Sequence, residues 1–252
     1  MAQISRRKLC AKTIEFVNKK INSQSVIKRN KKKASDFTRR GILTFPVLLL
    51  FQINSLRTSN QNELDIFFKK INNSDVPKRV VTDAAFSIAR KKVRYQVFHE
   101  LNRETVAHFY EHYEAEKWHG FYLLAIDGST VNAPNTPECR RHFGVSKNQH
   151  LEAEDERAMA KVSHCFDVLN SVTRDSMIRS SHTGEREMAE KHCESLGDTD
   201  LILLDRGYPD TRLFKLIKNG ALTFVREFPS GNGLSPVNFM LRDKRSRLRH
   251  FR

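Results

Sequence analysis

Hydrophobic residues follow two different periods along the chain, and the period changes near Phe121. Upstream, apolar residues recur every three to four positions, a spacing typical of helices that bury one face. This spacing predicts a buried helix over residues 41–57, a helix that begins at Thr82, and a longer helix over residues 96–116. Residues 1–40 show a weaker helical pattern, with apolar positions at Ile4, Leu9, Phe16, Val17 and Ile21.

From Phe121 onward, short apolar runs replace the helical period. Residues 121–126 are apolar and end in Asp127-Gly128-Ser129, which predicts a buried strand running into a turn. Two further strands are expected, joined by a tight hairpin at Asn170-Ser171. The expected elements after the first strand are strands at 159–169 and 172–180, a helix at 185–196, a strand at 201–204, a helix at 210–218 and a strand at 222–228.

This order of strands and helices is typical of an α/β layer built on one mixed sheet with flanking helices. We therefore expect an α/β domain over residues 121–228, preceded by a helical N-terminal lobe. The chain has 252 residues, of which 39% are apolar, so it is long enough to bury the core of one or two domains.

Positive charge is concentrated at the two ends of the chain. The net charge is +15; residues 1–40 hold 13 Lys and Arg against Glu15 and Asp36, and residues 237–252 hold six against Asp243. The middle of the chain is close to neutral. Basic ends of this kind are typical of proteins that bind nucleic acid, because cations docked on phosphate release counterions. A basic tail that only increases solubility is the alternative.

Two basic segments are candidate DNA contacts. The run Lys31-Lys32-Lys33 belongs to a stretch that should repel itself and stay solvated without a partner. Arg90 and Lys91 follow the helical pattern that begins at Thr82. They suit the negative end of a helix dipole, which is the structural alternative to a contact with DNA phosphate.

Several other classes of site are not indicated. The four cysteines, at positions 10, 139, 165 and 193, have no C-x-x-C spacing, so we expect reduced intracellular thiols rather than a zinc ribbon. The histidines lack the spacing of a helical zinc pair, although His164 lies beside the site proposed below. The longest apolar run, residues 41–51, is too short to span a bilayer. We expect a cytoplasmic protein with no membrane partner.

Two aspartates, Asp127 and Asp205, each follow a buried strand directly. Strand ends in open α/β sheets are favoured positions for ligands and metals. If the first and fourth strands lie side by side, the two carboxylates can share a hard cation such as Mg²⁺ or Mn²⁺. Each residue also has a simpler interpretation, because Asp127-Gly128 is a common turn pair and Asp205 could cap the next segment.

The motifs LLAIDGSTVNAP (Leu123–Pro134) and LILLDRGYPD (Leu201–Asp210), with Lys161, His164 and Asp167 between them, resemble the DDE transposases of bacterial insertion sequences, in the IS-four group. The stretch VTDAAFSIARKKV also resembles the N-terminal region of that group. The resemblance covers roughly residues 40–228. In it, Asp127 matches the first catalytic carboxylate and Asp205 the second.

The resemblance implies a ribonuclease-H-like fold, divalent metal and DNA transposition by phosphodiester hydrolysis and strand transfer at double-stranded terminal inverted repeats. It further implies a homodimer on DNA in a bacterial nucleoid. Arg206 would hold a DNA phosphate or form a salt bridge. The implied organisation is a basic arm (1–40), a helical DNA-binding region (41–118), a ribonuclease-H-like core (119–228) and a basic tail (229–252).

One departure from the family concerns the third carboxylate, a Glu within a pattern of Tyr, two residues, Arg, three residues, Glu, six residues and Lys. That pattern is absent after Asp205, and Glu227 lies too early to replace it. We therefore expect a truncated transposase that is inactive by itself. The alternatives are a DNA-binding transposase remnant without catalysis, an inhibitor of intact transposase, and an idle product of a decayed gene.

Overall fold

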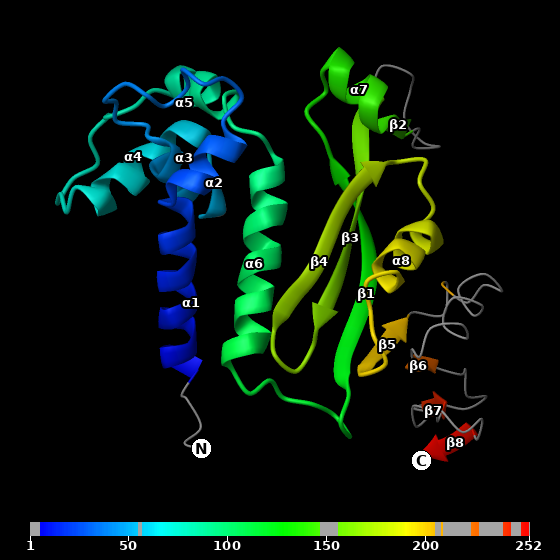
Figure 1. Cartoon of the computed structure of the whole chain (residues 1–252). Helices are drawn as coiled ribbons and strands as arrows, with labels where there is room; N and C mark the ends of the chain where they lie inside the picture. The colour runs from blue at the N-terminus through cyan, green and yellow to red at the C-terminus, as the bar shows by residue number, and fades with distance from the viewer. Residues whose placement is uncertain are drawn as a thin grey trace. The chain divides into compact units, whose positions relative to one another are not determined.

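The computed structural model describes residues 6–54, 57–146, 156–204 and 208, together with 223–226, 239–242 and 248–251. The chain divides into two compact units, Met1–Tyr113 and Glu114–Arg252. The first unit is helical and the second is built on a sheet (Figure 1). No helix among the described residues is both long and apolar enough to cross a membrane.

Six helices form the first unit. Side chains of Thr44, Ser59 and Thr82 accept hydrogen bonds from backbone N–H groups in the first turns of α3, α4 and α5, which stabilises those helix starts. Pro46 lies in the first turn of α3, where a backbone N–H would have no helical partner. The N–H that proline lacks is therefore not missed at this position. The helices are α1 (Arg6–Ile21), α2 (Gln24–Asn30), α3 (Phe45–Ile53), α4 (Asn60–Ile71), α5 (Asp83–Arg90) and α6 (Gln96–His112).

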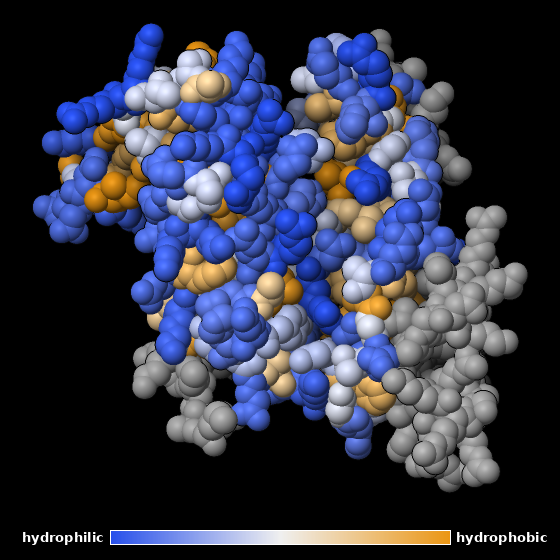
Figure 2. Space-filling model, in the orientation of Figure 1, coloured by the Kyte–Doolittle hydropathy of each residue, from blue (hydrophilic) through white to orange (hydrophobic). Residues whose placement is uncertain are grey.

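A single apolar core joins all six helices. It includes Ile21 from α1 and Val26 from α2, which are as deeply buried as Leu48 and Phe86. On the face shown in Figure 2, apolar side chains also gather over α4, in which Ile66 and the last residue, Ile71, are exposed. The predicted helices at 41–57, 82–90 and 96–116 are present with shorter bounds, whereas α4 was missed because its apolar positions are confined to a short stretch.

The basic run at 28–33 belongs to the folded helical unit. Lys28 and Arg29 lie in α2, and Asn30 is buried and donates hydrogen bonds to the carbonyl of Val26 and to Glu100 of α6. The side chains of Lys28, Arg29, Lys32 and Lys33 are exposed, as expected for a solvated run of charges. No pattern in the sequence indicated the buried Asn30, which anchors the backbone between these cations.

The second unit holds a mixed sheet with flanking helices, as expected. Its neighbours run in the order β2-β3-β1-β5-β6, and β4 also pairs with β3. β1 is antiparallel to β3 and parallel to β5. The elements are β1 (Tyr122–Asn132), α7 (Pro137–Phe143), β2 (Val145–Ser146), β3 (Arg157–Asp167), β4 (Val172–Ser180), α8 (Glu185–Cys193), β5 (Asp200–Leu204) and β6 (Thr223–Arg226).

Helix α8 covers one face of this sheet (Figure 1). Leu124 and Ile126 of β1, Cys165 of β3 and Ile202 of β5 pack with Ala189 of α8 in an apolar cluster. Within the tail predicted at 229–252, β7 (Phe239–Arg242) and β8 (Leu248–Phe251) form a separate antiparallel pair. The helix predicted at 210–218 lies outside the described residues.

Two details of the predicted strands were wrong. β1 does not end in a turn at Asp127-Gly128, because β3 continues to pair with it as far as Asn132. The hairpin between β3 and β4 has a four-residue loop over 168–171, since Asp167 and Val172 form its last pair. Ser171 takes a positive φ of 56° in that loop. The pair Asn170-Ser171 is compatible with turns of more than one length, so the sequence did not distinguish a two-residue loop from this four-residue one.

The four cysteines are expected to differ sharply in reactivity. Burial raises the pKa of Cys165 to about 12 and that of Cys193 to about 11, whereas Cys10 is exposed and Cys139 half-buried. The thiolate is the reactive form, and at pH 8 only about one in a thousand Cys193 side chains, and fewer for Cys165, would be ionised, so both should react slowly. We expect iodoacetamide to label Cys10 and Cys139 in the native protein, and all four cysteines only after unfolding. Peptide mass spectrometry would detect this, and rapid native labelling of Cys165 would contradict it.

Candidate functional site

The candidate site is built around Asp127 on β1. Among the described residues, the last pair between β1 and β5 is Ile126 with Leu204, and Asp127 is the next residue of β1. On the other side, Asp127 is directly opposite His164 in the antiparallel ladder with β3. Both side chains are exposed. Because Leu124 and Ile126 face α8, strand alternation directs Asp127 to the opposite face of the sheet.

The Asp127 carboxylate has a defined local partner. Its Oδ1 accepts a hydrogen bond of 2.8 Å from the N–H of Gly128. A hard, exposed carboxylate oxygen at this position suits a divalent cation such as Mg²⁺ or Mn²⁺. Among the residues that the structure describes, however, no group of three His, Cys, Asp or Glu side chains comes together as a metal cluster.

Gly128 allows α8 to approach β1 closely. A Cβ atom at this position would lie 3.2 Å from Cγ of Glu185 and 3.4 Å from the hydroxyl of Tyr208, so a larger residue would be in contact with Tyr208 and would displace the Glu185 side chain slightly. Glu185 begins α8, and its Oε1 lies 3.3 Å from Nζ of Lys161 on β3. Lys161 therefore has an ion-pair partner on the helix-covered face, away from the Asp127 carboxylate.

A group of polar side chains that includes the buried Ser163 and His192 lies directly behind Asp127. The hydroxyl of Ser163, on β3, donates to the backbone carbonyl of Asp127 at 3.2 Å. His192 of α8 is fully buried, with Nε2 3.1 Å from the Ser163 hydroxyl and Nδ1 2.8 Å from Asp175 on β4. Sequence reasoning missed this group, since Ser163, Asp175 and His192 are separated by 12 to 29 positions and share no motif.

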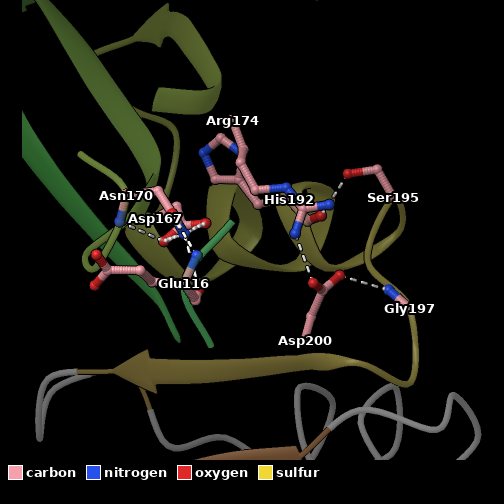
Figure 3. Close-up of polar contacts among 8 residues, drawn as sticks. All are labelled: Glu116, Asp167, Asn170, Arg174, His192, Ser195, Gly197 and Asp200. Atoms are coloured by element: carbon pink, nitrogen blue, oxygen red, sulfur yellow. Dashed lines mark hydrogen bonds and ion pairs between the residues drawn. The ribbon is translucent and has the colours of Figure 1, made fainter. Parts of the chain in front are cut away.

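The polar residues nearer the start of β1, Asp167, Asn170, Arg174 and Asp200, are structural (Figure 3). Asp167 is buried and accepts hydrogen bonds from the backbone and side chain of Asn170, which closes the β3–β4 hairpin. Arg174 donates to Asp200 at 2.5 Å, and Asp200 also accepts from the N–H of Gly197 at 2.8 Å. Asp167 thus lies near the start of β1, three pairing positions from the Asp127–His164 pair.

Two of the predicted site residues, Asp205 and Arg206, lie outside the described residues, and so does Glu227. What is described is the strand that leads to Asp205, since Leu204 ends β5 opposite Ile126.

The two basic segments proposed as DNA contacts are brought together in the first unit. Lys31 forms a backbone bridge with Val93, and the N–H of Lys32 donates to the carbonyl of Lys92 at 2.8 Å. The N–H of Arg94 donates to the carbonyl of Asn30 at the same distance. Segments about 60 positions apart in the sequence are therefore adjacent. We call the cations of these two segments the basic surface: Lys31, Lys32, Lys33, Arg90, Lys91, Lys92 and Arg94.

Most of this basic surface is open to solvent. All of its side chains are exposed except that of Lys31, which is half-buried and donates to the carbonyl of Ala34. Among the described residues, no acidic side chain forms an ion pair with any of the seven, whereas the nearby Arg29 is paired with Glu100. Tyr95, at its edge, is 69% exposed. Unpaired cations beside an exposed aromatic ring are a combination that suits a nucleic-acid backbone.

Comparison with known proteins shows a distant similarity of this chain to a curated protein. No family model matches the chain. Over 111 residues the chain is 24% identical to Putative transposase InsZ of Escherichia coli (strain K12), a match that covers 44% of this chain and 37% of that protein. The chain is distantly similar to a transposase. The match spans little more than a third of the relative's length, so it suggests a transposase role and leaves the particular chemistry to be argued from the site.

Proposed function

We propose that this chain is a DDE-type DNA transposase, or part of one, that acts on the ends of an insertion sequence. The observation that carries the proposal is the parallel pairing of β1 with β5. Asp127 follows the last pair on one strand, and Asp205 is the residue after Leu204, the last pair on the other. Neighbouring strands are about 4.8 Å apart, and consecutive Cα atoms about 3.8 Å apart. Carboxylates that directly follow paired residues on neighbouring strands are therefore expected to be close enough to bind one ion.

The order of the sheet supports the ribonuclease-H-like interpretation. An antiparallel β4-β3-β1 meander continues into β5 and β6, each parallel to its neighbour, and α8 crosses over between β4 and β5. This arrangement leaves β1 in the centre of the sheet, where its backbone is held on both sides. A central strand is a rigid support for a carboxylate that has to keep its position during catalysis.

Asp127 and Asp205 are the residues that would hold Mg²⁺ or Mn²⁺. A divalent ion in such a site supplies activation of a water or 3′-hydroxyl and stabilisation of the leaving oxygen at a phosphodiester. The chain's own contributions are the two carboxylates and the rigid strands that carry them. His164, opposite Asp127, stands on the same open face of the sheet.

Double-stranded DNA is the proposed substrate, and the basic surface of the first unit is its proposed docking site. Sequence recognition of terminal inverted repeats and a homodimer on DNA belong to the same proposal and rest on the resemblance to the IS-four group. The likeness to Putative transposase InsZ supports the class of protein, and the exposed, unpaired cations support the class of partner.

A metal-binding and nicking experiment tests the proposed chemistry. We expect purified chain to bind Mn²⁺ weakly, with binding lost in Asp127→Ala and in Asp205→Ala. We also expect negligible nicking of transposon-end DNA by these 252 residues, because the pattern that carries the family's third carboxylate is absent from them. Loss of one group that stabilises the transition state costs several kcal/mol, and each ~1.4 kcal/mol is tenfold in rate.

Calorimetry would measure the binding, and a supercoiled-plasmid assay the nicking. Manganese binding that survives both substitutions would overturn the site. Robust nicking that either substitution abolishes would instead show that a third carboxylate is not required, or that another acid such as Glu227 replaces it. DNA binding without any metal binding would favour the alternative, a DNA-binding transposase remnant or an inhibitor of intact transposase.

A further inference from the structure

A chain of hydrogen bonds runs from β4 through α8 and β3 to the backbone of Asp127. Asp175 contacts Nδ1 of His192, Nε2 of His192 contacts the hydroxyl of Ser163, and that hydroxyl donates to the Asp127 carbonyl. His192 is 0% exposed and Ser163 is 1% exposed. Polar groups so deeply buried are costly unless they are hydrogen-bonded, so the chain fixes these side chains in one arrangement.

The end of this chain is one particular peptide group. The carbonyl of Asp127 and the N–H of Gly128 belong to the same planar peptide unit. The carbonyl accepts from Ser163, and the N–H donates to the Asp127 carboxylate at 2.8 Å. Because the unit is rigid, any rotation that breaks the bond to Ser163 also turns the N–H away from the carboxylate.

We propose that Ser163 and His192 are positioning residues that hold the Asp127 carboxylate in place through this peptide group. The inference rests on the proposed function, in which Asp127 binds a divalent ion. A carboxylate that is already oriented loses less conformational freedom when it binds a cation, and hydrogen bonds behind a metal ligand commonly tune its affinity. The serine acts on the ligand through the backbone and does not touch the ion.

An alternative role for the same three side chains is nucleophilic catalysis, since serine, histidine and aspartate also form hydrolytic triads. The burial of Ser163 argues against it. A nucleophile has to reach its substrate, whereas this hydroxyl is enclosed between β3 and α8 and already donates to a backbone carbonyl. The arrangement suits support of the strand and not attack on a substrate.

The sequence offers a direct reporter of this peptide group. Asp127-Gly128 is the only Asp-Gly pair in the chain. Full-length protein labelled with ¹³C-carbonyl aspartate and ¹⁵N-glycine therefore gives one carbonyl–amide correlation in an NMR spectrum, that of Gly128. Its chemical shift and its hydrogen-exchange rate report the N–H bond to the carboxylate, and its broadening by paramagnetic Mn²⁺ reports binding next to Asp127.

Ser163→Ala is the decisive variant, and Cys165→Ala is its matched control. Cys165 lies two positions along the same strand, is equally buried, and likewise loses one side-chain heavy atom when changed to alanine. We expect Ser163→Ala to shift the Gly128 signal, to raise its exchange rate roughly fivefold and to weaken Mn²⁺ binding there roughly fivefold, the effect of one net hydrogen bond. We expect Cys165→Ala to leave all three unchanged. Ser163→Thr, which keeps the hydroxyl, should retain the wild-type Gly128 shift.

The outcomes separate this inference from the proposed function. If the Gly128 signal in Ser163→Ala matches that in Cys165→Ala, the positioning role is overturned whatever the metal does. If the signal shifts only in Ser163→Ala but Mn²⁺ never broadens it in the wild-type protein, the link to Asp127 holds and the metal site fails. If both variants weaken Mn²⁺ binding equally, the effect is general loosening of the core, and the inference is again overturned.

Discussion

Deletion of residues 1–40 is expected to unfold the helical unit rather than simply to remove a DNA-binding arm. The deletion takes away Ile21 and Val26, which are both fully buried in the core of that unit. Loss of one large buried aliphatic side chain costs about 2–5 kcal/mol, and a typical domain has only about 5–15 kcal/mol in total. It also removes Asn30, whose carbonyl and side chain bind Arg94 and Glu100.

Circular dichroism and limited proteolysis would measure the outcome. We expect loss of most of the helical signal of the first unit and rapid cleavage within residues 41–113. Lys12→Gln together with Lys19→Gln is the control, because both side chains are exposed on α1 and their change removes charge without touching the core. A deletion variant with the wild-type melting curve would restore the interpretation of residues 1–40 as a separate arm.

Charge reversal on the basic surface is expected to lower DNA affinity on the order of a hundredfold at moderate salt. The variant is Lys32→Glu, Lys91→Glu and Lys92→Glu, three exposed cations from the two adjoining segments. Each cation docked on phosphate contributes close to one unit (~0.9) to the slope of log affinity against log salt, so the slope should fall by about three units. The loss should be similar for any duplex sequence, because phosphate contacts carry no base information.

Fluorescence anisotropy with a labelled duplex in EDTA would measure this without involving the metal site. The control, Lys12→Glu, Lys70→Glu and Lys78→Glu, makes the same change in net charge at exposed positions elsewhere in the first unit. An equal loss in both variants would mean that binding depends on overall charge and not on the basic surface. Unchanged binding after reversal would show that the surface does not contact DNA.

The elements with strong periodic signals could be predicted from the sequence. The apolar run before Asp127 and the one before Asp205 predict strands because four or more consecutive apolar residues need burial on both faces of a sheet. The structure confirms both as β1 and β5 and confirms their parallel pairing. Helix α5 and its cap Thr82 were similarly clear, but its buried face is formed by Phe86 and Ala89, whereas the expected apolar position Ile88 is 61% exposed.

Elements whose stability depends on distant partners were not predictable. The continuation of β1 beyond Gly128 depends on β3, which supplies hydrogen bonds as far as Met159. Helix α2 depends on Val26 and Asn30 packing against other helices, since a seven-residue helix is not stable by itself. A charge run such as 28–33 gives a strong local signal for solvated side chains, whereas the burial of Asn30 between these cations depends on tertiary packing.

The sequence by itself determined which residue types stand where the chemistry is proposed: a carboxylate after each of two buried strands, and lysine and arginine in two separate runs. These follow from local composition and period. Only the tertiary structure decided that Lys32 and Lys92 are neighbours, and that Ser163, His192 and Asp175 converge on the peptide group of Asp127. Such contacts join positions that are distant along the chain, and they form because packing the two cores brings particular side chains within hydrogen-bond reach, for which no local pattern in the sequence carries a signal.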